Sequence, residues 1–204
     1  MRTFTDDFLK ECGRITSALS VPAIECLADT LAAIRNGVPP GRLFVLGNGG
    51  GLGTASHAAA DFRCLAGIQA LAPESPAELT ALANDYGFDE TFAIWLARHH
   101  PGSQDGLMVL SVGGGHRDGP SANIVRAAEY AVQIDMPVFS IVGRTDGFAF
   151  QCSTPGLALP DFVAQDWITP HAEWVQSMVL HLLVSHPRLK IQNPVWEQWR
   201  ANPT

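Results

Sequence analysis

The sequence has few cysteines, and they are not spaced for a disulfide framework or a zinc knuckle. Cys12, Cys26, Cys64 and Cys152 are scattered, with no C-x-x-C pair, so we expect small, buried, reduced thiols. The sequence also lacks an apolar run of membrane-spanning length, and residues 1–7 contain no apolar signal-peptide core. These absences predict a cytoplasmic protein with no membrane partner.

Charged residues are scarce as well. They make up 16% of the chain, against 47% hydrophobic residues, and the net charge is −7. An acidic chain of this kind is a poor partner for nucleic acid. So low a fraction of charged residues suggests that part of the protein surface is buried in an oligomer. The length, 204 residues, suits one domain with a substantial core.

Apolar strands alternate with helical segments from residue 42 onward. Strands are expected at 42–47, 106–111, 137–142 and 156–160, with a weaker candidate at 67–71. Helices are expected at 4–19, 22–36, 53–66, 77–83, 89–99, 121–134 and 169–186, with a turn at 84–87. Strands that are apolar throughout belong to a parallel sheet covered on both faces. The prediction is an α/β fold, a three-layer αβα sandwich with a parallel sheet and an N-terminal helical extension.

The most informative segment is the glycine-rich turn after the first strand. Residues 47–53 read Gly-Asn-Gly-Gly-Gly-Leu-Gly, and His57 and Asp61 follow at i and i+4 on a helix. The N–H groups of such a turn and of a helix N-terminus hold anions. A dinucleotide cofactor is disfavoured, because no acidic residue ends a second strand about 20 residues further on. The segment indicates chemistry on a small phosphorylated substrate.

A second buried strand also runs into glycines. Residues 111–116 read Ser-Val-Gly-Gly-Gly-His and lead to Ser121, a good N-cap for the next helix. Two such junctions can face each other across the switch point of a sheet and hold a phosphate between them.

The last helix carries Glu173 and His181, eight residues apart on one face. His181 has apolar neighbours, so it is either a core histidine or a ligand. Together with His57 and Asp61, these residues offer two imidazoles and two carboxylates. That set suits a divalent metal such as zinc, or an acid–base pair beside a carbonyl.

These motifs together resemble the sugar isomerase (SIS) domain, and within that fold the phosphoheptose isomerases. The resemblance implies one SIS domain with a flavodoxin-like sheet: helices over 1–37, a core over 42–186 and a tail over 187–204. The closing segment 193–204 carries Trp196 and Trp199, and we expect it to pack onto a neighbour. It also implies an aldose–ketose isomerase that is a homotetramer. Such an enzyme interconverts sedoheptulose 7-phosphate and a heptose 7-phosphate through an enediol.

The resemblance assigns roles to particular residues. The ligands of a divalent metal, zinc by preference, fall on His57, Asp61, Glu173 and His181, and the acid and base are Asp61 and His181 in either order. Substrate contacts fall on both loops, the 84–87 turn and the last helix: Asn48, Gly49, Gly50, Gly51, Asn84, Asp85, Ser111, Val112, Gly113, His116, Arg117, Ser121 and Glu173.

Several positions depart from the family's pattern. Gly51, Val112 and Gly113 stand where the family has hydroxyl side chains, and an insertion with His116 and Arg117 enters the second loop. We expect Arg117 either to contact the phosphate or to be a solvated loop residue. At the metal site, an aspartate replaces the family's glutamate and a glutamate replaces its glutamine, which makes the site more anionic.

Two alternatives remain open. The chain could be a non-catalytic SIS module that senses a sugar phosphate, although such regulators usually carry a DNA-binding domain, which this sequence does not contain. It could also be an SIS-fold isomerase of a different sugar, unphosphorylated or differently phosphorylated. Metal content and turnover of sedoheptulose 7-phosphate would discriminate among these hypotheses.

Overall fold

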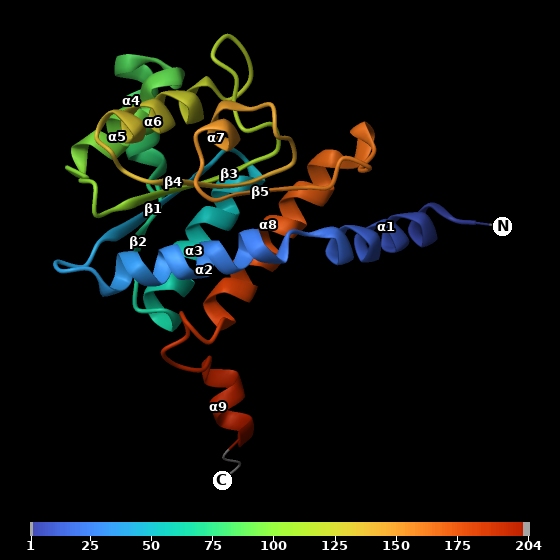
Figure 1. Cartoon of the computed structure of the whole chain (residues 1–204). Helices are drawn as coiled ribbons and strands as arrows, with labels where there is room; N and C mark the ends of the chain where they lie inside the picture. Colours follow the sequence, from blue (N-terminus) through green and yellow to red (C-terminus); the bar gives the residue numbers. More distant parts are fainter. Residues whose placement is uncertain (1, 202–204) are drawn as a thin grey trace.

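Five parallel strands form one sheet in the order β2-β1-β3-β4-β5 (Figure 1). They are β1 (Arg42–Gly47), β2 (Gln69–Leu71), β3 (Gly106–Ser111), β4 (Val138–Val142) and β5 (Gly156–Ala158). This is the flavodoxin-like strand order, and it confirms the predicted fold class. The weak strand candidate at 67–71 is the short edge strand β2.

The computed structural model describes residues 2–201. Its helices are α1 (Phe4–Ala18), α2 (Val21–Asn36), α3 (Gly50–Leu65), α4 (Pro76–Tyr86), α5 (Thr91–Arg98), α6 (Ala122–Gln133), α7 (Phe148–Gln151), α8 (Ile168–Ser185) and α9 (Val195–Ala201). Two short 3-10 turns lie at Phe88–Glu90 and Gln165–Trp167.

Alternate residues of the strands face two separate hydrophobic cores. Along β1, Leu43 and Val45 point to the core shared with α2, α3 and α8, whereas Phe44 and Leu46 point to the core shared with α4, α5 and α6. Both faces of the sheet are therefore covered, as Figure 1 shows. This is the predicted αβα sandwich.

The two N-terminal helices differ in their roles. In α2, Leu27, Ala28 and Leu31 are fully buried against the sheet and α8, so α2 belongs to the sandwich and not to an extension. Of these two helices, α1 is the one that projects from the body of the molecule (Figure 1). Its Phe8 stacks on His171 at a ring-centroid distance of 4.6 Å, which anchors α1 to the beginning of α8.

Three local expectations were wrong. The turn expected at 84–87 is the last part of α4, which continues through Tyr86 and ends at Gly87, where φ is 86°. Helix α9 forms in a tail for which no helix was expected. All four cysteines are free, but Cys26 and Cys64 are exposed and the other two are only half-buried.

Within the described part of the chain, no single helix is long and apolar enough to cross a membrane, and α1 with α2 pass such a test only as a pair bent by 65°.

An ion pair between Arg42 and the buried Asp105 links the amino-terminal ends of β1 and β3. The glycine loops follow the carboxyl-terminal ends of the same strands. Asp105 is 1% exposed and accepts hydrogen bonds from the Arg42 backbone at 2.7 Å, the Arg42 guanidinium at 2.8 Å and the Gly102 backbone at 3.0 Å. Burial favours the protonated carboxyl, but these hydrogen bonds outweigh it and hold the pKa of Asp105 below its ordinary value.

We therefore expect Asp105→Asn to lower the free energy of unfolding by about 2–3 kcal/mol at neutral pH, because it weakens a buried, hydrogen-bonded charge pair. Since the pKa is lower in the folded state, this stabilisation is present above the ordinary Asp pKa of about 4 and is lost as the pH falls through the folded-state value. Urea unfolding of both proteins at neutral and acidic pH measures the difference. The difference in free energy of unfolding between wild type and Asp105→Asn should be smaller at acidic pH. An equal difference at both pH values would contradict a stabilising role for the ionised Asp105 carboxylate.

Candidate functional site

The switch in strand order brings the two glycine-rich loops together. Strand β1 pairs in parallel with β3, with Gly47 opposite Leu110. The loops that follow the two strands therefore begin side by side at the carboxyl-terminal ends of the strands. Asn48 joins them: its amide and that of Asn123 exchange hydrogen bonds of 2.9 and 3.0 Å. The two junctions therefore face each other as the sequence predicts.

Close backbone packing explains the glycine at position 51. A Cβ atom there would lie 2.7 Å from the carbonyl oxygen of Leu110, and a Cβ atom at Gly47 would lie 2.5 Å from the backbone of Gly51. The beginning of α3 thus rests directly on the end of β3. A serine hydroxyl at position 51 would not fit without moving this helix.

A cleft of about 390 Å³ opens beside the two loops. Six of the predicted substrate-binding residues line it: Asn48, Ser111, Val112, Gly113, His116 and Ser121. Six lining residues were not predicted, and three of them have polar side chains, namely Arg144, Gln165 and Thr169. They follow β4 or lie at the beginning of α8, where no motif marks them, and only the order of the strands places them next to the loops.

Ser121 does not cap α6 as expected. Its backbone is left-handed, with φ of 64°, and its side chain makes no capping hydrogen bond. Instead its hydroxyl oxygen accepts a 3.2 Å hydrogen bond from the Asn48 amide. The hydroxyl hydrogen is therefore available to a ligand in the cleft.

His116 and Arg117, both on the inserted loop, lie in different surroundings. His116 lines the cleft, whereas Arg117 does not belong to the lining. The Arg117 guanidinium pairs with Glu129 at 2.8 Å and lies 5.0 Å from the centre of the Phe148 ring. Its predicted contact with phosphate remains a prediction.

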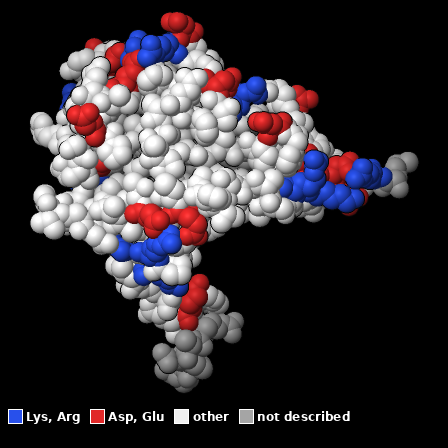
Figure 2. Space-filling model, viewed as in Figure 1, with Lys and Arg blue, Asp and Glu red and all other residues white. Residues whose placement is uncertain are grey.

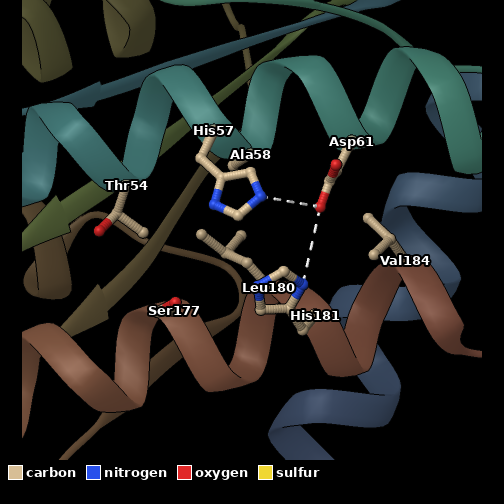
Figure 3. A pocket seen from close by; sticks show the side chains of 8 residues that line it. All are labelled: Thr54, His57, Ala58, Asp61, Ser177, Leu180, His181 and Val184. Carbon is tan, nitrogen blue, oxygen red and sulfur yellow. Dashed lines mark ion pairs between the residues drawn. The ribbon is translucent and has the colours of Figure 1, made fainter. Parts of the chain in front are cut away.

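His57, Asp61 and His181 come together where α3 packs against α8, as Figure 3 shows. The Asp61 carboxylate lies 3.4 Å from Nε2 of His57 and 3.6 Å from Nδ1 of His181. One ligand atom from each residue lies within 4.8 Å of the others. The His181 side chain is 54% exposed, so it is not a core histidine.

This cluster could hold a divalent metal. Two imidazole nitrogens and one carboxylate oxygen are the donor set of open zinc sites, in which a fourth position is left for water or substrate. The ligand atoms are close enough to converge on one ion after small rotations of the side chains. The residues present therefore fit a metal.

Glu173 does not join the cluster within one chain. Its carboxylate packs against the beginning of α3, because a Cβ atom on Gly50 would lie 2.6 Å from the carboxylate atoms. Glu173 is not among the residues whose ligand atoms lie within 4.8 Å of one another, which are His57, Asp61 and His181. Three of the four predicted ligands are therefore close together in this structure.

The sequence profile of the SIS domain family matches residues 6–143, more than half of the chain. The chain belongs to the SIS domain family.

Similar proteins narrow the comparison within this family. A phosphoheptose isomerase from Helicobacter hepaticus is 32% identical over 171 residues, 79% of each chain. One from Bordetella avium is 32% identical over 189 residues, 88% of this chain and 86% of the relative. The structure of a phosphoheptose isomerase from Neisseria gonorrhoeae matches with a TM-score of 0.74 at 24% sequence identity. The match covers 89% of this SIS domain chain and 96% of the other chain, and it supports the assignment of the fold.

The cluster generates a prediction about metal binding by this SIS domain. We expect the purified protein to bind Zn²⁺ by isothermal titration calorimetry, and His57→Ala to weaken that binding at least about tenfold because it removes one of three ligands. His186→Gln is the matched control, since His186 also lies at the end of α8 but pairs with Glu25 outside the cluster. Equal Zn²⁺ affinity in wild type and His57→Ala would contradict the assignment.

Proposed function

We propose that this protein is an aldose–ketose isomerase that converts sedoheptulose 7-phosphate into a heptose 7-phosphate. The observation that carries the proposal is the convergence of His57 and Asp61 of α3 with His181 of α8, because α3 begins at the glycine loop beside the cleft. Membership of the SIS domain family and the phosphoheptose isomerases among its relatives support it.

The dimensions of α3 relate the cleft to the cluster. Seven residues separate Gly50, at the beginning of α3, from His57, which is about 10 Å along the helix axis. The substrate phosphate would occupy the cleft, and the far end of an extended sugar chain would reach toward the cluster. Because the reacting carbons of a 2-ketose lie far from a terminal phosphate, this arrangement suits a long phosphosugar.

The cluster supplies groups for proton transfer next to a carbonyl. Asp61 and His181 act as base and acid, one removing the proton from the carbon beside the carbonyl and the other handling the C1 and C2 oxygens. Their mutual distance of 3.6 Å lets each orient the other. A divalent metal, zinc by preference, would be held by His57, Asp61 and His181 and would polarise the carbonyl.

The proposed assembly is a cytoplasmic homotetramer. In the face shown in Figure 2, charged side chains gather in small groups toward the margins, and much of the centre carries neither sign. Phe4 and Leu9 of α1 and Val195 of α9 are exposed apolar side chains on the two projecting helices. Neighbouring copies would cover these surfaces and complete the site around the cluster.

Two alternatives receive different support. A non-catalytic sensor of a sugar phosphate has no need of the His57, Asp61 and His181 cluster. An SIS-fold isomerase of a different sugar, unphosphorylated or differently phosphorylated, keeps that cluster and is favoured by one observation, the absence of hydroxyl side chains at Gly51, Val112 and Gly113.

Incubation of the purified protein with sedoheptulose 7-phosphate tests the proposal, with the aldose product followed by chromatography. We expect turnover with Zn²⁺ present, none above background in His181→Ala prepared in the same way, and turnover close to wild type in His186→Gln. Unphosphorylated sedoheptulose should react at least about tenfold less efficiently, because it lacks the group bound in the cleft. A folded, metal-loaded wild-type protein that leaves sedoheptulose 7-phosphate unchanged would refute the proposed function.

A further inference from the structure

The cleft beside the glycine loops offers few hydroxyl donors for a doubly charged anion. Val112 and Gly113 have none, and Gly51 cannot carry a side chain. The Ser111 hydroxyl oxygen accepts a buried 3.0 Å hydrogen bond from the Gly114 N–H, so it helps to shape the loop itself. A phosphate monoester carries close to two negative charges at neutral pH. Another group must compensate that charge.

Arg144 lies where such a group is required. It follows β4, the strand next to β3, and it lines the cleft. The residue before it, Gly143, donates a 2.9 Å hydrogen bond to the carbonyl of Val112, and a Cβ atom on Gly143 would lie 2.8 Å from that oxygen. The backbone at Arg144 is therefore fixed against the second glycine loop.

The Arg144 side chain is held in place but still has donors to offer. Nη1 donates to Oε1 of Gln165, and Nε lies 3.6 Å from the Asp146 carboxylate. Gln165 also lines the cleft. A guanidinium has five N–H donors, so it can keep these contacts and still donate two parallel hydrogen bonds to an anion.

No other residue of the cleft carries a fixed positive charge. Among the described residues that line it, there is no lysine, aspartate or glutamate, and His116 is the remaining residue that can become cationic. Arg117, on the same insertion, is paired with Glu129 and lines a different hollow together with Phe148 and Gln151. The guanidinium next to the two loops is that of Arg144.

We propose that Arg144 binds the phosphate group of the substrate and replaces the hydroxyl donors missing from the two loops, an inference that rests on the proposed function of the cleft. The planar fork of the guanidinium matches two phosphate oxygens, which a lysine ammonium cannot do. Arg144 thereby makes phosphate recognition in this chain depend on a permanent charge.

The test measures substrate kinetics and the binding of inorganic phosphate in parallel. We expect Arg144→Ala to raise the KM for sedoheptulose 7-phosphate at least about tenfold with kcat within about twofold, because the contact is made equally in the ground and transition states. Calorimetry should show the affinity for inorganic phosphate falling by a similar factor. Arg144→Lys should recover only part of both losses, since it restores the charge but not the two parallel hydrogen bonds.

Arg126→Ala is the matched control. It removes a surface guanidinium of α6 that pairs with Glu129 on the same helix and with Glu90 of the 3-10 turn and does not line the cleft. This change should leave KM and phosphate affinity unchanged. Phosphate affinity within about twofold of wild type in folded Arg144→Ala would overturn the inference. A loss of phosphate affinity in Arg117→Ala and not in Arg144→Ala would overturn it as well. If wild type does not turn over sedoheptulose 7-phosphate but binds phosphate through Arg144, the proposed substrate is wrong and the inference about Arg144 stands.

Discussion

The parallel pairing of β1 with β3 is the constraint on which the rest of the site depends. It places two strand–glycine–helix junctions next to each other, and the reciprocal amide pair of Asn48 and Asn123 closes the gap between them. Because β4 pairs with the other edge of β3, its end is brought to the same cleft. A cleft at a topological switch point, where α/β folds commonly bind their ligands, follows from this order of strands.

The same pairing determines where the reactive side chains lie. The beginning of α3 rests on the end of β3 so closely that Gly51 has no room for a Cβ atom. From that fixed point α3 runs against α8, and the helical repeat carries His57 and Asp61 to the face that meets His181. Because α3 is packed on β3 and against α8, the partly exposed side chains of the cluster have a defined geometry without burial of a charge.

Much of this could be predicted from the sequence, because the determining signals are local. The apolar strands, the glycine turns and the i, i+4 spacing of His57 and Asp61 identify the fold class and two thirds of the cluster. His181 is a candidate from the sequence as well, but the choice between a core histidine and a ligand needed the family resemblance. What could not be predicted depends on long-range contacts. Arg144 carries no motif and reaches the cleft only through strand order, and the Arg117–Glu129 ion pair depends on how the insertion folds back on α6. Likewise, only the structure shows the Glu173 carboxylate against Gly50.

The central claim is that the His57, Asp61 and His181 cluster transfers the proton while the cleft holds the phosphate. Steady-state kinetics of Asp61→Asn on sedoheptulose 7-phosphate tests it most directly, because the change removes a carboxylate and keeps its shape. The account predicts that kcat falls at least about a hundredfold while phosphate affinity stays within about twofold of wild type. A folded Asp61→Asn protein with kcat within about threefold of wild type would contradict it.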